Sequence, residues 1–312
     1  MSSRPIRFGV CLPQHGSAWS DVVAVARACD RLGFDSVWAV DHFFGIPDAT
    51  APLFEGWTEL TAVAALTERV RIGHLVICVS YRNPAVLAKM VATIDHVSAG
   101  RFILGMGAGW HQQEYQAYGI PFPPIGRRLQ ELDEALGLMR KMWTDEPASF
   151  FGEHFHSEEA YCRPRPVQQP YPPILVGGTG EKVLLRIVAE HADIWNNLGW
   201  AHAQLEKKAE ILRRHCDRLK RDFEAIEISQ QTVAAIGATE AEARRATAAV
   251  RAEVPFLAGG DELIIAGTPD ECIERVRRTV AMGATSLLLS FGRNPPVEML
   301  ELFAGTVLPA FR

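Results

Sequence analysis

The sequence lacks several features that would place it quickly in a functional class. Its 312 residues contain no run of about 18 apolar residues, so no segment is predicted to cross a membrane. Lysine and arginine (32) nearly balance aspartate and glutamate (37), and like charges form no block. A nucleic-acid or anionic-membrane surface is therefore not expected. Six cysteines stand singly without a Cys-x-x-Cys pair, which is typical of a reduced, cytoplasmic protein.

Common catalytic motifs are missing as well. The chain has no Gly-x-Ser-x-Gly and no His-Glu-x-x-His, so serine-hydrolase and zincin chemistry lack support. A glycosidase needs two carboxylates, and Asp41 has no convincing second. His154 and His156 with Glu158 and Glu159 resemble metal ligands in spacing. Without a third close histidine they favour a solvated hairpin, and we expect no metal.

The sequence does contain a regular alternation of short apolar runs and amphipathic stretches. Eight runs are predicted strands: 6–12, 34–40, 70–79, 101–106, 174–177, 193–196, 226–236 and 284–290. Eight strand–helix units favour a closed (β/α)8 TIM barrel, an α/β fold, as one domain over 1–312. After the fourth strand, a long helix, a strand-rich stretch and several prolines form an insertion at about 111–172, which we expect to lie over the site.

Local signals predict where helices begin and end. Ser20 is a candidate N-cap, and Gly33 a terminator, of the first helix. Asn83-Pro84 predicts a helix start, and Thr268-Pro269-Asp270-Glu271 reads as a capping box. Further helices are predicted over 181–191 and 239–254.

The second predicted strand ends in Asp41 and His42. Polar groups at the carboxyl end of a parallel strand lie where α/β folds bind their ligands. A structural interpretation is equally open on position alone: Asp41 capping the next element and His42 filling a gap. Because glycine turns follow strands four and five at the same rim, we favour a functional pair.

Two glycine-rich turns follow predicted strands. Gly105-Met-Gly-Ala-Gly-Trp110 has the wrong spacing and place for a dinucleotide fingerprint. It is either a tight rim turn or, as we prefer, backbone lying close to a ligand. Val176-Gly177-Gly178-Thr179-Gly180 joins a strand to a helix, and its N–H groups predict an anion site. A flexible loop is the alternative.

Taken together, these stretches resemble the bacterial luciferase-like family of flavin- and deazaflavin-dependent (β/α)8 oxidoreductases, and the branch that uses coenzyme F420 is the most similar. The resemblance covers nearly the whole chain. It is carried by the stretches at 7–14, 36–42, 82–89, 100–110, 118–123, 173–178 and 192–196.

The resemblance implies an enzyme that transfers a hydride between coenzyme F420 and a small organic substrate. The alternatives are an FMN-dependent monooxygenase that uses reduced flavin and O2 and a non-catalytic flavin carrier. Asp41 and His42 would lie at the cofactor ring as catalytic candidates, and Leu75 and Val76 would form a bulge with a non-proline cis peptide. The remaining implied cofactor contacts are Gly107, Ala108, Gly109, Arg127, Val176, Gly177, Gly178 and Thr179.

The chain also departs from relatives that oxidise sugar phosphates or alcohols. Their Trp shortly after the His is replaced by Phe43-Phe44-Gly45-Ile46, and Trp110 stands where they carry a Glu. Their acid–base arrangement and substrate are therefore not expected here. The implied substrate pocket is apolar and aromatic, formed by Gln14, Phe44, Trp110 and Trp195. Family members are often homodimers, so a homodimer is possible.

Overall fold

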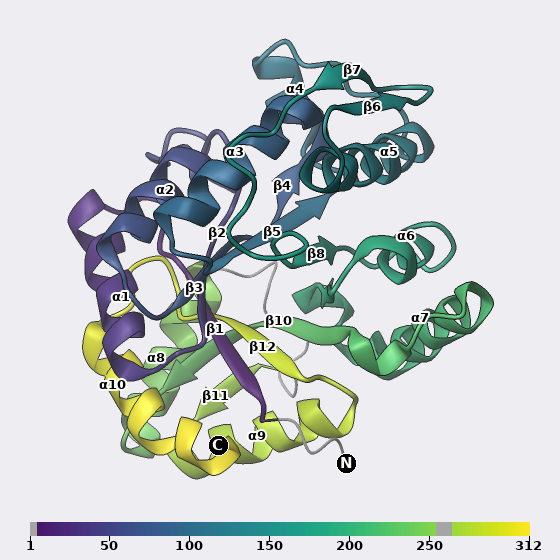
Figure 1. Ribbon diagram of the computed structural model, residues 1–312. Helices are drawn as coiled ribbons and strands as arrows, with labels where there is room; N and C mark the ends of the chain where they lie inside the picture. The colour runs from purple at the N-terminus through teal and green to yellow at the C-terminus, as the bar shows by residue number, and fades with distance from the viewer. Residues whose placement is uncertain (1–4, 254–263) are drawn as a thin grey trace.

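Eight parallel strands close into a barrel in the computed structural model, which describes residues 5–253 and 264–312 (Figure 1). The barrel runs β10-β12-β1-β2-β3-β5-β8-β9, and pairing of β9 with β10 closes it. The predicted TIM barrel is confirmed. The barrel strands are β1 (Arg7–Cys11), β2 (Ser36–Ala39), β3 (Arg71–His74), β5 (Phe102–Gly107), β8 (Ile174–Gly177), β9 (Ile194–Asn197), β10 (Glu227–Ile236) and β12 (Ser286–Ser290).

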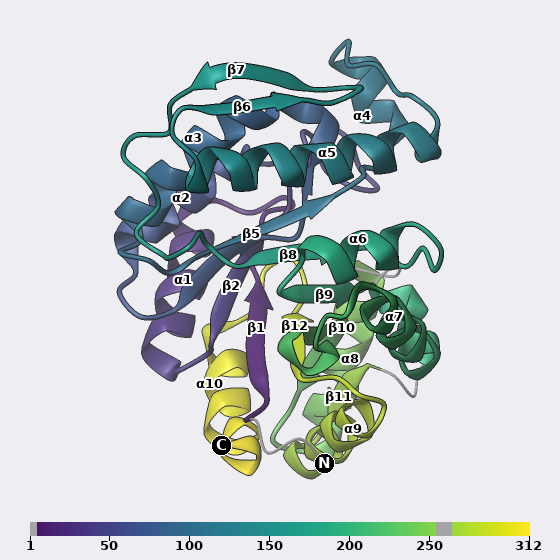
Figure 2. The same ribbon diagram turned by 45° about the vertical axis from the view of Figure 1, so that its right-hand side comes forward.

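Helices cover the outside of the barrel (Figures 1 and 2). They are α1 (Trp19–Leu32), α2 (Gly56–Leu66), α3 (Pro84–Val97), α4 (Gln112–Ala117), α5 (Ile125–Thr144), α6 (Leu184–His191), α7 (Leu205–Leu219), α8 (Glu240–Glu253), α9 (Pro269–Ala281) and α10 (Val297–Thr306). Short 3-10 helices are η1 (Val79–Tyr81), η2 (Gly199–Gln204), η3 (Phe223–Ala225) and η5 (Leu308–Phe311). Among the described residues, no helix is long and apolar enough to cross a membrane.

Most predicted helix boundaries follow from local chemistry. Asn83 caps α3 by accepting from the N–H groups of Ala85 and Val86, and Gly33 ends α1 in the left-handed conformation. The Thr268 capping box is present at α9. The Ser20 cap is wrong: the N-cap is Ala18, so α1 begins two residues earlier than predicted, and the Asp21 carboxylate accepts from the N–H of Ala18.

Other boundaries differ from the predictions. The single strand predicted at 70–79 is two, because β3 ends at His74 and β4 (Ile77–Cys78) pairs separately with β5. A short strand, β11 (Ile265–Gly267), was not predicted and pairs with β10. Helix α6 begins at Leu184, three residues later than predicted. Helix α8 ends at Glu253, and position 254 of its predicted range lies outside the described residues.

Two apolar layers surround the barrel wall. The outer layer packs strand residues against the helices. The inner one fills the lumen with Trp38, Leu75, Ile103, Leu175, Ile194 and Leu288. Strand alternation also directs Gly107 and Gly177 inward at the carboxyl end of the barrel. We call this end the mouth.

The predicted insertion contains a short helix, α4, and an antiparallel hairpin. Helix α5 lies between them in the sequence and is itself the helix of the fourth strand–helix unit. The antiparallel hairpin of β6 (Ala148–Phe151) and β7 (His156–Ala160) packs on α5, and it lies on the outer side of that helix (Figure 2). The hairpin predicted around His154 is therefore confirmed. The expectation that the insertion covers the site is wrong for this hairpin, because its contacts are with α5.

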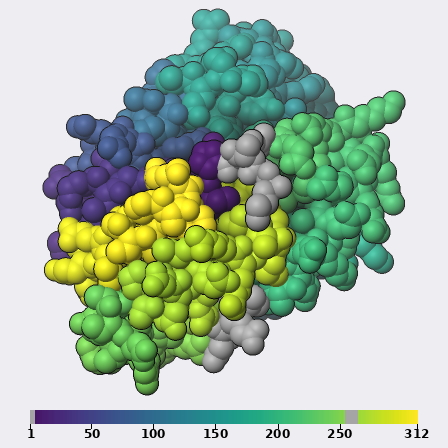
Figure 3. Space-filling model, turned by 90° about the horizontal axis from the view of Figure 1, so that it is seen from below, coloured from purple at the N-terminus to yellow at the C-terminus, as the bar shows by residue number. Residues whose placement is uncertain are grey.

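The first and last strand–helix units that the structure describes lie next to each other in the barrel wall. β1 pairs with β12, and α1 packs against α10. Seen from below, the first and last segments lie side by side (Figure 3). This closure fixes the seam of the barrel, so that the strand ends at the mouth keep their relative positions.

Candidate functional site

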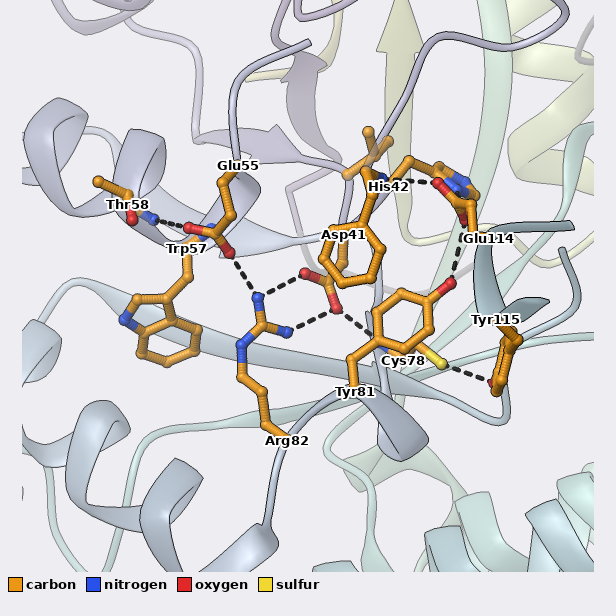
Figure 4. Close-up of polar contacts among 12 residues, drawn as sticks. Asp41, His42, Glu55, Trp57, Thr58, Cys78, Tyr81, Arg82, Glu114 and Tyr115 are labelled. Atoms are coloured by element: carbon orange, nitrogen blue, oxygen red, sulfur yellow. Dashed lines mark hydrogen bonds and ion pairs between the residues drawn. The ribbon is translucent and has the colours of Figure 1, made fainter. Parts of the chain in front are cut away.

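Asp41 lies at the end of β2 and anchors a neighbouring loop (Figure 4). Its side chain is 2% exposed and accepts two hydrogen bonds from Arg82, at 2.8 and 2.9 Å, and one from the Cys78 N–H at 3.0 Å. Burial by itself would lower the pKa of Arg82. The carboxylates of Asp41 and Glu55 have the larger effect, so the pKa of Arg82 is raised above its usual value. A bidentate ion pair and a backbone bond engage both oxygens of Asp41, which therefore acts as an anchor. Its catalytic and cofactor-contact roles stay predictions.

His42 is the next residue, and its ring reaches the mouth. Its Nδ1 lies 2.8 Å from Oε2 of Glu114, and its side chain keeps 19% of its surface exposed. A carboxylate can only accept, so Nδ1 carries the hydrogen. Nε2 is therefore the ring nitrogen left to exchange a proton with a bound molecule.

Glu114 is a residue of this candidate site that sequence reasoning missed. It is fully buried on α4 and accepts from His42, from the Phe43 N–H at 2.6 Å and from the Tyr81 hydroxyl at 3.0 Å. Burial raises the pKa of Glu114, but the bond from His42 and the other donors outweigh it and hold that pKa below its usual value. Glu114 stays ionised and fixes the orientation of His42. Because 72 residues separate the two, no sequence spacing reveals the pair.

Other imidazoles lie beside this pair. The His111 ring packs edge-on against that of His42 with centroids 5.9 Å apart, and its Nδ1 is 3.5 Å from Glu114 Oε2. Burial and the neighbouring His42 lower the pKa of His111. Glu114 opposes this effect but does not cancel it. Burial and His42 likewise lower the pKa of His15 to about 4. His15 and His111 are therefore neutral near pH 7.

His42, His111 and Glu114 also offer ligand atoms within 4.8 Å of one another, a spacing at which a metal ion could be held. The Glu114 oxygen in this group already accepts from both His42 and Tyr81. The oxygen therefore serves as a hydrogen-bond acceptor in this structure. The expectation that the protein holds no metal stays a prediction.

The end of strand three forms the floor of the mouth. The peptide between Leu75 and Val76 is cis, as the resemblance implies. A Cβ on Gly107 would lie 2.7 Å from the Val76 side chain, and a Cβ on Gly177 would lie 2.9 Å from it. Only glycine lets these two strands approach Val76 so closely. The result is close packing of Val76 against the backbone at the carboxyl ends of β5 and β8.

Ala108 and Gly109 have structural neighbours of their own. The Ala108 carbonyl accepts from Arg128 Nε at 3.1 Å. Gly109 has φ +72°, and a Cβ there would lie 2.1 Å from the Tyr115 hydroxyl. Packing against Tyr115 is thus sufficient reason for this glycine. The predicted cofactor contacts of the two residues stay predictions.

The turn after β8 is arranged differently from the predicted anion cradle. The Gly178 N–H donates to the Asn196 carbonyl at 3.1 Å, so it is not free for a phosphate. Trp195 Nε1 donates to the Gly178 carbonyl at 2.9 Å, and Lys208 donates to that of Thr179 at 2.7 Å. Val176 is fully buried in the outer core. An anion at this turn therefore has to use N–H groups from Thr179 onward.

Two of the predicted pocket residues face the mouth. Trp110 is 61% exposed and packs edge-on against His42 at 5.7 Å, and Phe44 packs against His111 at 5.5 Å. Trp195 is fully buried, so its prediction as a pocket wall is wrong; it holds Gly178 in place.

Gln14 is also buried rather than lining a pocket. It accepts from the Val40 N–H at 2.5 Å and donates to Glu59 at 2.6 Å. Burial raises the pKa of Glu59 to about 8, although the bond from Gln14 opposes the rise. Glu59 thus holds Gln14, and Gln14 holds the backbone at the end of β2 through the Val40 N–H.

Arg127 lies in another groove. Its Nε pairs with Glu131 at 3.0 Å, and it lines a cavity of about 480 Å³ with residues 79–83 and 120–123. The role of Arg127 at a phosphate stays a prediction.

Comparison with known proteins gives three kinds of match. A family model described as luciferase-like monooxygenase matches residues 6–260. An uncharacterised protein of Mycobacterium tuberculosis is 34% identical over 189 residues, covering 55% of this chain and only 65% of that relative's length. The F420-dependent glucose-6-phosphate dehydrogenase of Gordonia bronchialis is 28% identical over 94% of this chain and 93% of its own.

The fold has solved counterparts. An F420-dependent secondary alcohol dehydrogenase, in complex with an F420-acetone adduct, superposes with a TM-score of 0.84 over 99% of both chains. At 21% identity, this likeness shows the fold alone.

Proposed function

Because the chain belongs to the luciferase-like monooxygenase family, we propose that it is an oxidoreductase that transfers a hydride between coenzyme F420 and a small organic substrate. The relative from Gordonia bronchialis, named as F420-dependent, supports this choice of cofactor because the match spans 94% of this chain. When bound, a deazaflavin supplies the hydride chemistry, while the protein supplies binding, orientation and protons.

The residues at the mouth fit such a cofactor. Gly107 and Gly177 leave no room for a Cβ beside Val76, so the backbone of β5 and β8 and the Val76 side chain form a surface against which one face of a flat ring would lie. Asn196 adds a polar edge to the lumen, since its Nδ2 is buried and has no hydrogen-bond partner among the described residues. The phosphate would lie at the N–H groups that follow Gly178.

The observation that carries the proposal is the His42–Glu114 pair. Glu114 keeps the hydrogen on Nδ1, so Nε2 can accept a proton from a substrate hydroxyl or, once protonated, return it to a carbonyl oxygen. Buried Glu114 also holds the His42 ring in place during the transfer. This is the proton half of an alcohol–carbonyl interconversion, for which the cofactor supplies the hydride half.

The rim around Nε2 favours an apolar substrate. Trp110 and the neutral ring of His111 pack against His42, and Phe44 packs against His111. Among the described residues no lysine or arginine takes part in these ring contacts, and the nearby Arg293 donates to the Ile46 carbonyl. We infer a small alcohol or carbonyl compound with an apolar body.

An FMN-dependent monooxygenase is the second candidate, favoured by the description of the matching family model. The turn after Gly178 suits the phosphate of either cofactor. Fluorescence titration of the purified protein with F420 and with FMN distinguishes them. The proposal expects tight F420 binding and turnover with alcohols or carbonyls. Tight FMN binding without F420 binding contradicts it, and binding of both without turnover on any screened substrate favours a non-catalytic carrier.

A further inference from the structure

A groove outside the barrel lies next to the proposed phosphate turn. It has a volume of about 310 Å³ and runs between the segment after β8 and helix α7. Its lining residues are Glu181, Lys182, Ile211, Arg214, His215 and Arg218. Positions 211, 214, 215 and 218 recur at helical spacing, so one face of α7 forms one wall. Glu181, only three residues after Gly178, belongs to the other wall.

The groove is cationic although the protein is acidic overall, with a net charge of −5. The carboxylate of Glu181 is already paired with Lys207 at 3.0 Å and Lys208 at 3.3 Å. Lys182 and Arg218 have no hydrogen bond or ion pair with any residue that the structure describes. These two cations are free to pair with a ligand.

Arg214 adds a third positive charge to the groove. It pairs within its own helix with Glu210, at 3.2 Å on the exposed surface. An exposed pair of this kind is weak and can exchange for another anion at little cost.

The two walls are held together by internal bonds. His215 Nε2 lies 3.0 Å from the Glu181 carbonyl, and Lys208, which is almost fully buried, donates to the Thr179 carbonyl. The segment from Thr179 to Glu181 is thus fastened to α7 at both ends. A groove whose walls are fixed in advance loses little entropy when it binds a flexible chain.

We propose that this groove binds the carboxylates of the oligoglutamyl tail that continues from the phosphate of a bound F420. The inference rests on the proposed function, because the tail reaches the groove only if the phosphate lies at the turn after Gly178. Successive carboxylates on a flexible chain match Lys182, Arg214 and Arg218, which are spread along one groove. FMN ends at its phosphate and would leave the groove empty.

The test compares F420 carrying several glutamates with the same cofactor shortened to its phospholactyl end, using equilibrium fluorescence titration. The wild-type chain is expected to bind the tailed form about 3- to 30-fold more tightly, as two or three exposed ion pairs allow. The triple variant Lys182→Gln, Arg214→Gln, Arg218→Gln is expected to lose this difference while binding the shortened form as before. Raising the salt concentration should shrink the difference in the wild type.

Arg213→Gln is the matched control. It removes the same charge from the neighbouring position on α7, where Arg213 stacks on Phe223 and faces Glu224, outside the groove. The tail preference should survive in this variant. Equal binding of both forms by the wild type, or a preference that persists in the triple variant, overturns this inference and leaves the proposed function standing. Binding of FMN but of neither F420 form overturns both.

Discussion

Replacing Glu114 with glutamine tests how the protein controls His42. Three donors point at this carboxylate: the His42 ring, the Phe43 N–H and the Tyr81 hydroxyl. A glutamine of the same shape has one oxygen and one NH2 group, so at least one donor faces another donor. Either His42 adopts the other tautomer, or a buried N–H or O–H loses its acceptor.

The expected loss follows from the strength of these bonds. A hydrogen bond to a charged group contributes about 1.5–3 kcal/mol, so Glu114→Gln should lower kcat about 10- to 150-fold. KM for the cofactor should change little, because Glu114 is buried beneath His42. The free energy of unfolding should fall by about 1–3 kcal/mol. The assays are steady-state kinetics, 15N NMR of the His42 tautomer and urea denaturation.

Glu134→Gln provides the matched control. Its carboxylate also accepts from three donors, the N–H groups of Glu153, His154 and Phe155, but in the hairpin segment beside α5. A comparable loss of stability with unchanged kcat is expected there. A kcat within about twofold of the wild type in Glu114→Gln, with His42 in its original tautomer, would refute the reasoning.

Three further variants address other parts of the site. His42→Ala should keep cofactor binding and lower turnover by about 10²–10⁴-fold, the range for a general acid–base group, and unchanged turnover would remove His42 from the mechanism. Glu59→Gln should flatten the dependence of stability on pH. The folded-state pKa of Glu59 is raised to about 8 from 4.5, so the unfolded state ionises first and stability falls by up to about 1.4 kcal/mol per pH unit across that window. Urea denaturation at pH 5.5 and pH 8 measures the difference, and equal slopes in both proteins would contradict it. Trp195→Phe leaves the Gly178 carbonyl without its donor and should cost about 1–3 kcal/mol of stability. It should also weaken binding of F420 but not of the phosphate-free deazaflavin riboside, and equal weakening of both would place the phosphate elsewhere.

The parts of the fold that sequence predicted well depend on local chemistry. Asn83 and Thr268 start helices because their side chains sit next to the N–H groups that need acceptors. The eight strands follow from apolar runs bounded by glycine and proline. The three-residue strand β11 escaped prediction because so short a run has no usable period.

The site was less predictable because its contacts join distant segments. His42 was identified from its place at a strand end, but its partner Glu114 comes from a short helix 72 residues away. Asp41 occupies an equally suggestive position, yet Arg82, 41 residues on, takes both of its oxygens. Sequence therefore indicated which end of the barrel carries the site, and the structure was needed to separate the exposed imidazole from the buried anchor.

Crystallographic difference density from the protein soaked with F420 tests the central claim most directly. We expect a flat ring over Val76, beside Gly107 and Gly177, with His42 Nε2 facing it and the phosphate at the N–H groups after Gly178. Density for the ring in the groove beside Arg127, or anywhere away from His42, would contradict it.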